Sequence, residues 1–152
     1  MLFKDIVGQQ NLKNRLIQTV NEGRISHAQL FVGKSGFGTL PLAIAYAQYI
    51  TCKNKQEGDS CGACTSCIKF NKLAHPDLHF SFPVSTNSSV KAKPVSNDFM
   101  QDWRELNLQK TYFDLDEWHE KIDIVQKQSL ISVHESHEVI KKLTLKPFEA
   151  EY

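Results

Sequence analysis

The sequence predicts a three-layer α/β domain that is built around a glycine-rich turn and carries an inserted zinc knuckle. An apolar run at residues 29–32 leads through closely spaced glycines into an apolar helix at residues 42–50. Alternating residues 78–82 predict a second strand, so strands alternate with helices along the chain. Four cysteines crowd into residues 52–67. The order of strands within the sheet is left open.

The composition is that of a soluble globular domain. The chain has 152 residues, of which 41% are hydrophobic and 23% charged, enough for one domain with a real core. Its 18 basic and 17 acidic residues give a net charge of +1, without the basic field that many nucleic-acid binders carry. The sequence has no apolar run of membrane-spanning length and no signal peptide. We therefore expect a cytoplasmic protein that does not contact membranes.

The first predicted helix covers residues 10–22, because Leu12, Leu16 and Val20 recur four residues apart and form one apolar stripe. Gly23 ends this helix, since glycine readily adopts the left-handed conformation found after a helix C-terminus. The strand at residues 29–32 and the glycine-rich turn follow.

The turn has the glycines of a phosphate-binding P-loop but lacks the charged chemistry. A P-loop carries Lys, which reaches the phosphates, and then Ser or Thr, which holds Mg²⁺. Here a threonine and a leucine stand at those positions, and leucine offers no oxygen to a magnesium ion. The pattern predicts a degenerate loop that does not hydrolyse ATP; alternatively, the glycines serve only tight packing. The residues concerned are Gly33, Lys34, Gly36, Gly38, Thr39 and Leu40.

The cysteines are separated by eight, two and two residues. Four thiolates complete a tetrahedral Zn²⁺ site and leave no position open, which predicts one structural zinc ion per chain. A rival set would combine two cysteines with His75 and His79, but its spacer is short and it leaves two cysteines unused. The predicted ligands are Cys52, Cys61, Cys64 and Cys67.

The rest of the chain alternates short helices and loops. Trp103 and Trp118 are expected to pack inside the domain rather than against a partner. Capping pairs at Asp114 with Glu117 and at Ser132 with Glu135 predict two helix starts. The expected segments are helix 68–74, a turn at 75–77, strand 78–82, loop 84–96, helices 97–105 and 115–123, and a helix ending at Leu143.

The order of these motifs resembles a known family. DIVGQ at 5–9, GRISHA at 23–28, the glycine-rich turn, the cysteines and HPD at 75–77 occur in the same order as in the N-terminal ATPase-like domain of bacterial DNA polymerase III clamp-loader subunits. These are AAA+ proteins that include the gamma/tau motor and the delta-prime stator. The resemblance covers residues 3–83 and returns at 131–152.

The resemblance implies a P-loop, AAA+-like domain with a zinc module at about 51–68 and an insertion at about 84–130. Residues 1–152 would be the N-terminal part of that domain, whose acidic strand and arginine finger would lie beyond Tyr152. The four cysteines are the implied zinc ligands. Val7, Gly8 and Gln9 are implied to lie beside a vestigial adenine pocket.

The resemblance further implies the function of a non-catalytic subunit that helps load the sliding clamp onto primed DNA. Because the P-loop is degenerate, the chain looks like the stator type, delta-prime, with gamma/tau and delta subunits as its partners and no ATP expected. Two alternatives stay open. One is an active gamma/tau-like ATPase that uses Lys34 or a residue outside this chain. The other is a zinc-knuckle module that binds nucleic acid in a salt-dependent manner.

Overall fold

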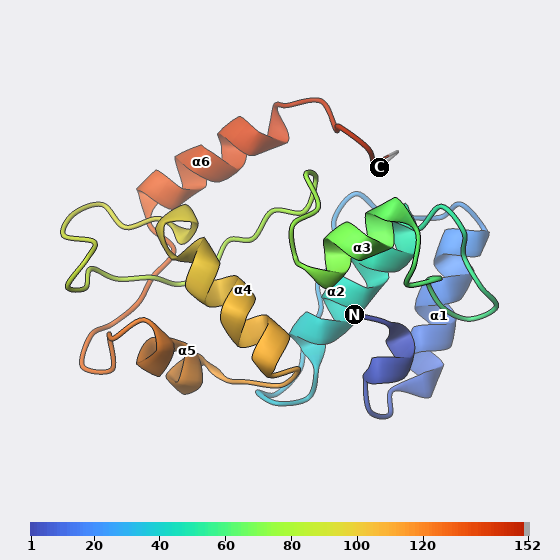
Figure 1. Cartoon of the computed structure of the whole chain (residues 1–152), viewed down its shortest axis with the longest axis horizontal. Coiled ribbons are helices and arrows are strands. Elements are labelled where there is room, and N and C mark those ends of the chain that lie inside the picture. The colour runs from blue at the N-terminus through green and yellow to red at the C-terminus, as the bar shows by residue number, and fades with distance from the viewer. Residues whose placement is uncertain (151–152) are drawn as a thin grey trace. The chain divides into compact units, whose positions relative to one another are not determined.

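The computed structural model describes residues 1–150 and divides the chain into two compact units, Met1–His75 and Pro76–Tyr152. Regular structure within the described residues is almost entirely helical (Figure 1). No helix in this part of the chain has both the length and the apolar character needed to cross a membrane. The elements are η1 Phe3–Asp5, α1 Gln10–Asn21, α2 Thr39–Thr51, α3 Thr65–Asn71, η2 Ser96–Phe99, α4 Met100–Gln109, α5 Leu115–Lys121 and α6 Val133–Leu143.

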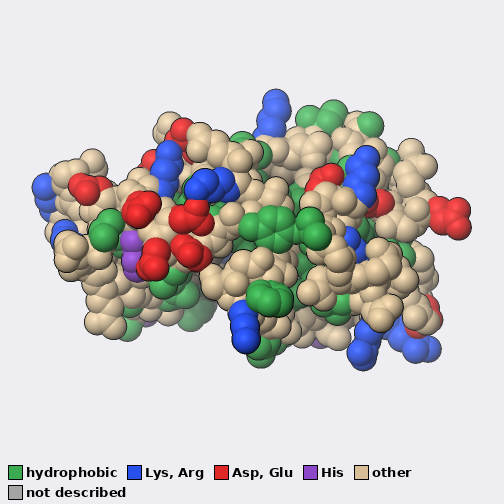
Figure 2. All heavy atoms as spheres, turned by 90° about the horizontal axis from the view of Figure 1, so that it is seen from below, with side chains coloured by type: hydrophobic (Ala, Val, Ile, Leu, Met, Phe, Trp, Pro, Cys, Tyr) green, Lys and Arg blue, Asp and Glu red, His purple; other side chains and the backbone are tan. Residues whose placement is uncertain are grey.

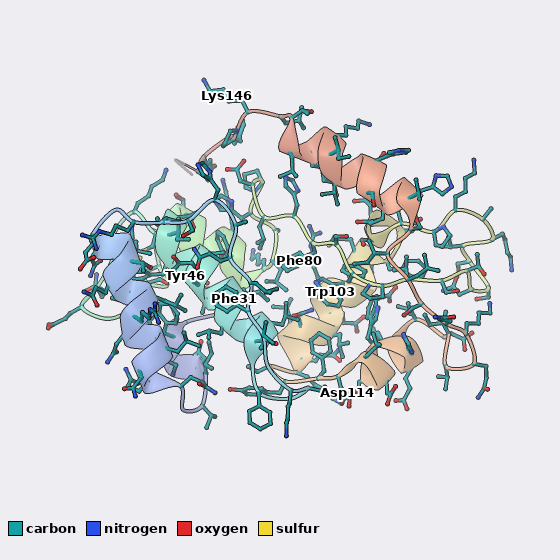
Figure 3. The ribbon with its side chains drawn as sticks, turned by 180° about the vertical axis from the view of Figure 1, so that it is seen from behind. Phe31, Tyr46, Phe80, Trp103, Asp114 and Lys146 are labelled. Carbon is teal, nitrogen blue, oxygen red and sulfur yellow. The ribbon has the colours of Figure 1, made fainter. Side chains whose placement is uncertain are left out.

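Helix α2 is the centre of the first unit. It contacts α1, α3 and η1, which explains why its sequence is apolar on most sides. The Phe3 ring lies 5.6 Å from that of Tyr49, and the Phe31 ring lies 6.2 Å from that of Tyr46 (Figure 3). The core cluster comprises Phe3, Ile6, Leu16, Leu42, Ala45, Tyr46 and Tyr49.

Helix α1 has almost the predicted bounds, but its buried face differs from the prediction. Leu16 is buried as expected, whereas Leu12 is 40% exposed. Lys13 is buried instead, and its Nζ donates a hydrogen bond to the carbonyl oxygen of Ile6. A lysine that lies on the core side satisfies a backbone carbonyl that water does not reach.

The predicted strand at residues 29–32 is wrong for the described part of the chain. The segment is not assigned to a strand, and no backbone hydrogen bond joins it to another segment among residues 1–150. Leu30 and Val32 are 88% and 82% exposed. A strand exists only where a neighbour pairs with it, and here none of the described segments does so. The three-layer arrangement is therefore also absent from residues 1–150.

An aromatic cluster forms the core of the second unit. Trp103 stacks on Phe82 with 4.1 Å between ring centroids and packs edge-on against Trp118 at 5.1 Å. Phe80 lies beside Trp103, as the labels in Figure 3 show. The indole nitrogen of Trp118 donates to the carbonyl oxygen of Pro83 at 2.9 Å. The prediction that both tryptophans pack internally is confirmed.

Residues 78–82 alternate in burial as predicted but do not form a strand. His79 and Ser81 are exposed, while Phe82 is buried and Phe80 is half-buried. The Phe82 nitrogen donates to the hydroxyl of Ser96 at 3.0 Å, so a side chain replaces the partner strand. The alternation reports the two faces of an extended segment, not its pairing.

The two predicted capping pairs behave differently. Asp114 and Glu117 form the full reciprocal box at the start of α5. At α6, the Ser132 hydroxyl accepts from the nitrogen of Glu135, but the Glu135 carboxylate is buried and accepts from the nitrogen of Ser96 at 2.7 Å. The capping box at α6 is therefore only half formed, because the Glu135 carboxylate bonds to the backbone of η2 instead of to the nitrogen of Ser132.

The ends of the expected insertion meet. Val84 and Leu130 exchange two backbone hydrogen bonds of 3.2 and 3.1 Å in an isolated antiparallel bridge. A second long-range tie involves Asp77, whose carboxylate accepts from the backbone nitrogens of residues 148–150. The second unit is closed by these contacts rather than by a sheet.

Candidate metal centre and phosphate-loop region

The ends of two helices and the loop between them position the four cysteines. Cys52 directly follows α2, and Cys61 lies in the connecting loop. Cys64 is the N-cap of α3, and Cys67 lies in its first turn. Residues three apart at a helix start point to the same side, so this pair of sulfurs faces the other two.

The sulfur atoms have the spacing of a tetrahedral metal site. All four lie within 4.8 Å of one another. The Cys61 sulfur is 3.6 Å from that of Cys52 and 3.9 Å from that of Cys67. Zinc–sulfur bonds of about 2.3 Å place tetrahedral sulfurs about 3.8 Å apart. The cluster can therefore hold one metal ion with little rearrangement.

Burial and hydrogen bonding shift the pKa values of the cysteine thiols in different directions. Burial and the nearby Cys64 and Cys52 thiols raise the pKa of Cys67 to about 12. Burial also acts to raise the pKa of Cys64, but hydrogen bonds from the backbone of Cys67 and Lys53 and from neighbouring thiols outweigh it and lower the pKa to about 6. Cys64 is therefore the thiol most readily ionised, and a bound cation would favour ionisation of the others.

Asp59 fixes the cysteine loop to the start of the chain. Its carboxylate accepts hydrogen bonds from the backbone nitrogens of Phe3 and Lys4, both at 3.0 Å, and from Ser60 at 2.8 Å. Three N–H donors satisfy a carboxylate without a cationic partner. The loop thus has a defined position relative to η1 and the core.

The glycine-rich segment forms a turn, in which the nitrogen of Phe37 donates to the carbonyl oxygen of Lys34 at 3.1 Å. Gly36 and Gly38 have φ angles of +79° and +80°, which glycine adopts without strain. Gly38 is the N-cap of α2, and its carbonyl accepts from the nitrogen of Leu42 at 3.0 Å. A Cβ at Gly33 would lie 2.7 Å from the methyl carbon of Thr39, so this glycine permits close packing.

A pocket of about 500 Å³ lies beside this turn. None of its described lining residues carries a charge, and Lys34 is not among them. Such a lining offers no ammonium to a triphosphate and no carboxylate to a magnesium ion. The lining residues are Gln9, Leu12, Leu16, Gln29, Leu30, Phe31, Val32, Gly33, Phe37, Gly38, Thr39 and Leu42.

The structure brings only part of the expected adenine-pocket set to this cavity. Gln9 lines it and is the left-handed N-cap of α1, with a φ of 56°. Val7 is 81% exposed, and neither it nor Gly8 is a lining residue. Of the glycine-rich turn, Gly33, Gly38 and Thr39 line the pocket, whereas Lys34, Gly36 and Leu40 do not.

Neither histidine of the rival ligand set joins the cysteines. His75 is buried and packs against Phe70, with 4.8 Å between the ring centroids. His79 is exposed. The geometry agrees with the preference for four cysteines over a mixed set.

The sequence analysis did not single out two polar residues near the cysteines, Asp59 and Gln48. Asp59 belongs to a loop of many polar residues, and nothing in its pattern distinguishes it. Gln48 is fully buried, and a signal existed: it is an amide within the otherwise apolar helical run Ala43–Ile50. A polar side chain inside an apolar helix requires a buried partner.

Comparison with known proteins gives the chain its family. A family model described as DNA polymerase III, delta subunit, matches residues 8–152. The chain belongs to this family. Membership supports an AAA+-like domain, although the described residues are mostly helical.

The relatives include other subunits of the same polymerase. The chain is 24% identical over 150 residues to DNA polymerase III subunit tau of Salmonella typhimurium, covering 99% of this chain and 22% of that protein. It is 25% identical over 145 residues to subunit tau of Escherichia coli, covering 95% and 21%. Subunit gamma/tau of Mycobacterium bovis is 35% identical over 66 residues, covering 43% and 11%.

The chain thus spans about a fifth of the length of the tau subunits it matches. No solved structure matches it significantly. Nearly the whole chain is thus similar to a part of these tau subunits.

Proposed function

We propose that this chain is part of a non-catalytic, delta-prime-type stator of the DNA polymerase III clamp loader. In this role it contacts gamma/tau and delta subunits in the cytoplasm and assists indirectly in placing the sliding clamp on primed DNA. The observation that carries the proposal is a glycine-rich turn at the start of α2 followed by Thr39 and Leu40 instead of Lys and Ser or Thr.

The local packing supports the loss of nucleotide chemistry. The Thr39 methyl group lies against Gly33, and Leu40 is half-buried in the first turn of α2. Lys34 is exposed and lies at the start of the turn, five residues before Thr39. A triphosphate with magnesium needs positive charge and oxygen ligands, and the uncharged pocket lining supplies neither.

In this proposal the four cysteines hold one structural zinc ion. Zinc accepts four thiolates in tetrahedral geometry, and the sulfur spacing suits that arrangement. With four protein ligands, no position is left for water or substrate. The ion would therefore hold the loop between α2 and α3 and would take no part in a reaction.

The proposed domain organisation assigns residues 84–130 to an insertion in an N-terminal AAA+-like part, with the zinc module at about 51–68. The Val84–Leu130 bridge supports the insertion, because it joins the ends of that segment. A chain can accept an added segment at such a point without changing its path on either side.

The charge distribution does not favour the nucleic-acid-binding alternative. On the face drawn in Figure 2, Lys and Arg side chains are spread among acidic and neutral ones rather than gathered in one patch. Four thiolates also outweigh the two charges of Zn²⁺, so a loaded centre is anionic. Direct binding to phosphates would need a basic surface.

Nucleotide binding tests the proposal. We would titrate the chain with a fluorescent ATP analogue and Mg²⁺, beside the double variant Thr39→Lys, Leu40→Thr, which restores the missing P-loop chemistry. We expect no binding by the unaltered chain and measurable binding by the variant. The variant Lys34→Gln is the matched control, because it tests whether Lys34 supplies the positive charge of the missing P-loop lysine.

Micromolar, magnesium-dependent binding by the unaltered chain would contradict the stator proposal and favour a gamma/tau-like ATPase. If Lys34→Gln abolished that binding, Lys34 would be the missing cation. If binding survived in Lys34→Gln, the charge would come from elsewhere. Salt-dependent binding to DNA by the unaltered chain would instead favour the zinc-knuckle alternative.

A further inference from the structure

We propose that the α-amino group of Met1 is the partner that holds the buried amide of Gln48, and that Gln48 and Asn71 form a site for a free N-terminal ammonium. An acyl group on this amine, or a residue placed before it, then loosens the end of α2 and the cysteine loop. The inference concerns a modification-sensitive site of the first unit, and it does not depend on a bound metal ion.

The buried amide of Gln48 depends on the Met1 amine. The Gln48 side chain has 0% exposure and lies in the last turn of α2. Its oxygen Oε1 accepts a hydrogen bond from the Met1 nitrogen at 2.8 Å. Its nitrogen Nε2 has no hydrogen-bond partner among the described residues. The bond to Met1 is therefore the anchor of this amide, and a buried amide without any partner destabilises the fold.

Asn71 completes the site from α3. Its oxygen Oδ1 accepts from the same Met1 nitrogen at 3.1 Å, on the solvent side of the site. Asn71 is the last residue of α3, so the amine joins the C-terminal turns of two helices. Hydrogen bonds from a charged donor are stronger than those from a neutral one, which favours an ammonium at this point.

Acylation removes the donors that the site requires. A charged amine offers three N–H donors, whereas an amide nitrogen offers one and carries no charge. The acyl carbon also takes the place of one of the amine hydrogens. A modified Met1 therefore cannot serve Gln48 and Asn71 together. Because Gln48 has 0% exposure, solvent does not replace the bond that its oxygen loses.

Neighbouring contacts carry the effect to the cysteine loop. The backbone nitrogens of Phe3 and Lys4 both donate to the carboxylate of Asp59 at 3.0 Å. The side-chain amide of Asn71 donates to the carbonyl oxygen of Gly62 at 3.3 Å. The loop is thus held at two points by groups that lie next to the amine, and a displaced chain start releases both.

Amide hydrogen exchange of the whole chain tests the site, with all samples at the same zinc concentration. An Nα-acetylated chain is made without other changes by ligating a synthetic segment 1–51 to an expressed segment that begins at Cys52. A second chain carries one glycine before Met1, which keeps a positive charge close by. We expect the last turn of α2 and the loop at 53–63 to exchange about 10-fold faster in both chains than in the unaltered one, because a buried amide loses its partner.

The variant Gln48→Met separates this site from other effects of the modification, because it keeps the length of the side chain and removes the amide that needs a partner. In this variant, acetylation should change the exchange rates by less than about twofold, since both changes remove the same interaction. Gln18→Met, at an exposed position of α1, is the matched control and should keep the full effect of acetylation.

Equal exchange rates in the acetylated and unaltered chains would overturn the proposal. So would an undiminished effect of acetylation in Gln48→Met, because the amine would then act through other contacts. If Gln48→Met does not fold, the glycine-extended chain decides. Unchanged exchange in that chain overturns the proposal, and faster exchange confined to the end of α2 and the cysteine loop supports it.

Discussion

Cys64 has two structural roles, because it is both a thiol of the metal cluster and the N-cap residue of α3. Its nitrogen donates to the sulfur of Cys61 at 3.3 Å, and its carbonyl accepts from the nitrogen of Ile68. The metal cluster and the start of the helix therefore share one residue. A change at this position acts on both.

We expect Cys64→Ser to lose the bound metal and to loosen the loop between Cys52 and Cys64, while the α1–α2 core stays folded. A serine hydroxyl can still cap a helix but is a poor zinc ligand. Metal content by mass spectrometry and amide hydrogen exchange across the loop check this. The exposed neighbour substitution Ala63→Ser is the control. One full equivalent of metal in Cys64→Ser would rule out the four-cysteine ligand set.

The start of α5 depends on a reciprocal pair of capping side chains. Asp114 accepts from the nitrogen of Glu117 at 2.9 Å, and the Glu117 carboxylate accepts in return from the nitrogen of Asp114 at 3.1 Å. Helix α5 has only seven residues, so propensity alone cannot sustain it. The cap holds the helix so that Trp118 enters the aromatic cluster.

Asp114→Ala is expected to lower the free energy of unfolding by about 1 kcal/mol, the usual cost of losing an N-cap. Chemical denaturation followed by tryptophan fluorescence measures it. Asp116→Ala, an exposed acid in the same first turn, should cost clearly less. Equal losses in both variants would indicate that helix-dipole charge, rather than capping, stabilises α5.

Local signals predicted the helices well and the strands badly, for a physical reason. Helix hydrogen bonds are internal, so apolar periodicity and caps located α1 and α5 to within two residues and α2 to within three. Strand hydrogen bonds come from another segment, and residues 29–32 and 78–82 have the composition of strands without a partner in the described chain. Helix α3 begins three residues earlier than predicted, because Cys64 caps it.

At the metal centre, too, local sequence patterns predicted the short-range contacts but not the long-range ones. The cysteine spacing predicted which side chains come together, because a short loop and one helical turn leave them few other arrangements. Gln48 and Asp59 accept hydrogen bonds from nitrogens at the start of the chain, and cysteine spacing does not encode such long-range contacts. Of the residues expected beside an adenine pocket, Gln9 lines the cavity next to the turn and Val7 does not, and whether that cavity takes adenine stays a prediction.

At the scale of the whole molecule, the folding of each unit can be followed with a different spectroscopic or exchange probe. Both tryptophans of the chain, Trp103 and Trp118, lie in Pro76–Tyr152, whereas the cysteines lie in Met1–His75. Tryptophan fluorescence therefore reports on the second unit. Hydrogen exchange in α2 and α3 reports on the first.

Removal of metal by a chelator should increase amide exchange in the cysteine loop and α3 and leave tryptophan fluorescence unchanged. The reason is that the metal bonds stabilise only the segment whose ligands they join. The same treatment of Cys64→Ser, which already lacks the metal, is the control and should have no effect. A fluorescence change in the unaltered chain alone would indicate that the metal also stabilises the second unit.

The extended segment at residues 29–32 has a practical consequence. Leu30 and Val32 are exposed, and the backbone there is unpaired within residues 1–150. Such an edge is a template on which another extended chain can add, and this is a common route to aggregation. A preparation of this 152-residue chain alone is therefore expected to lose solubility as the protein concentration rises. A lysine at the Leu30 position would be the simplest protection, because a charge on an open edge discourages pairing.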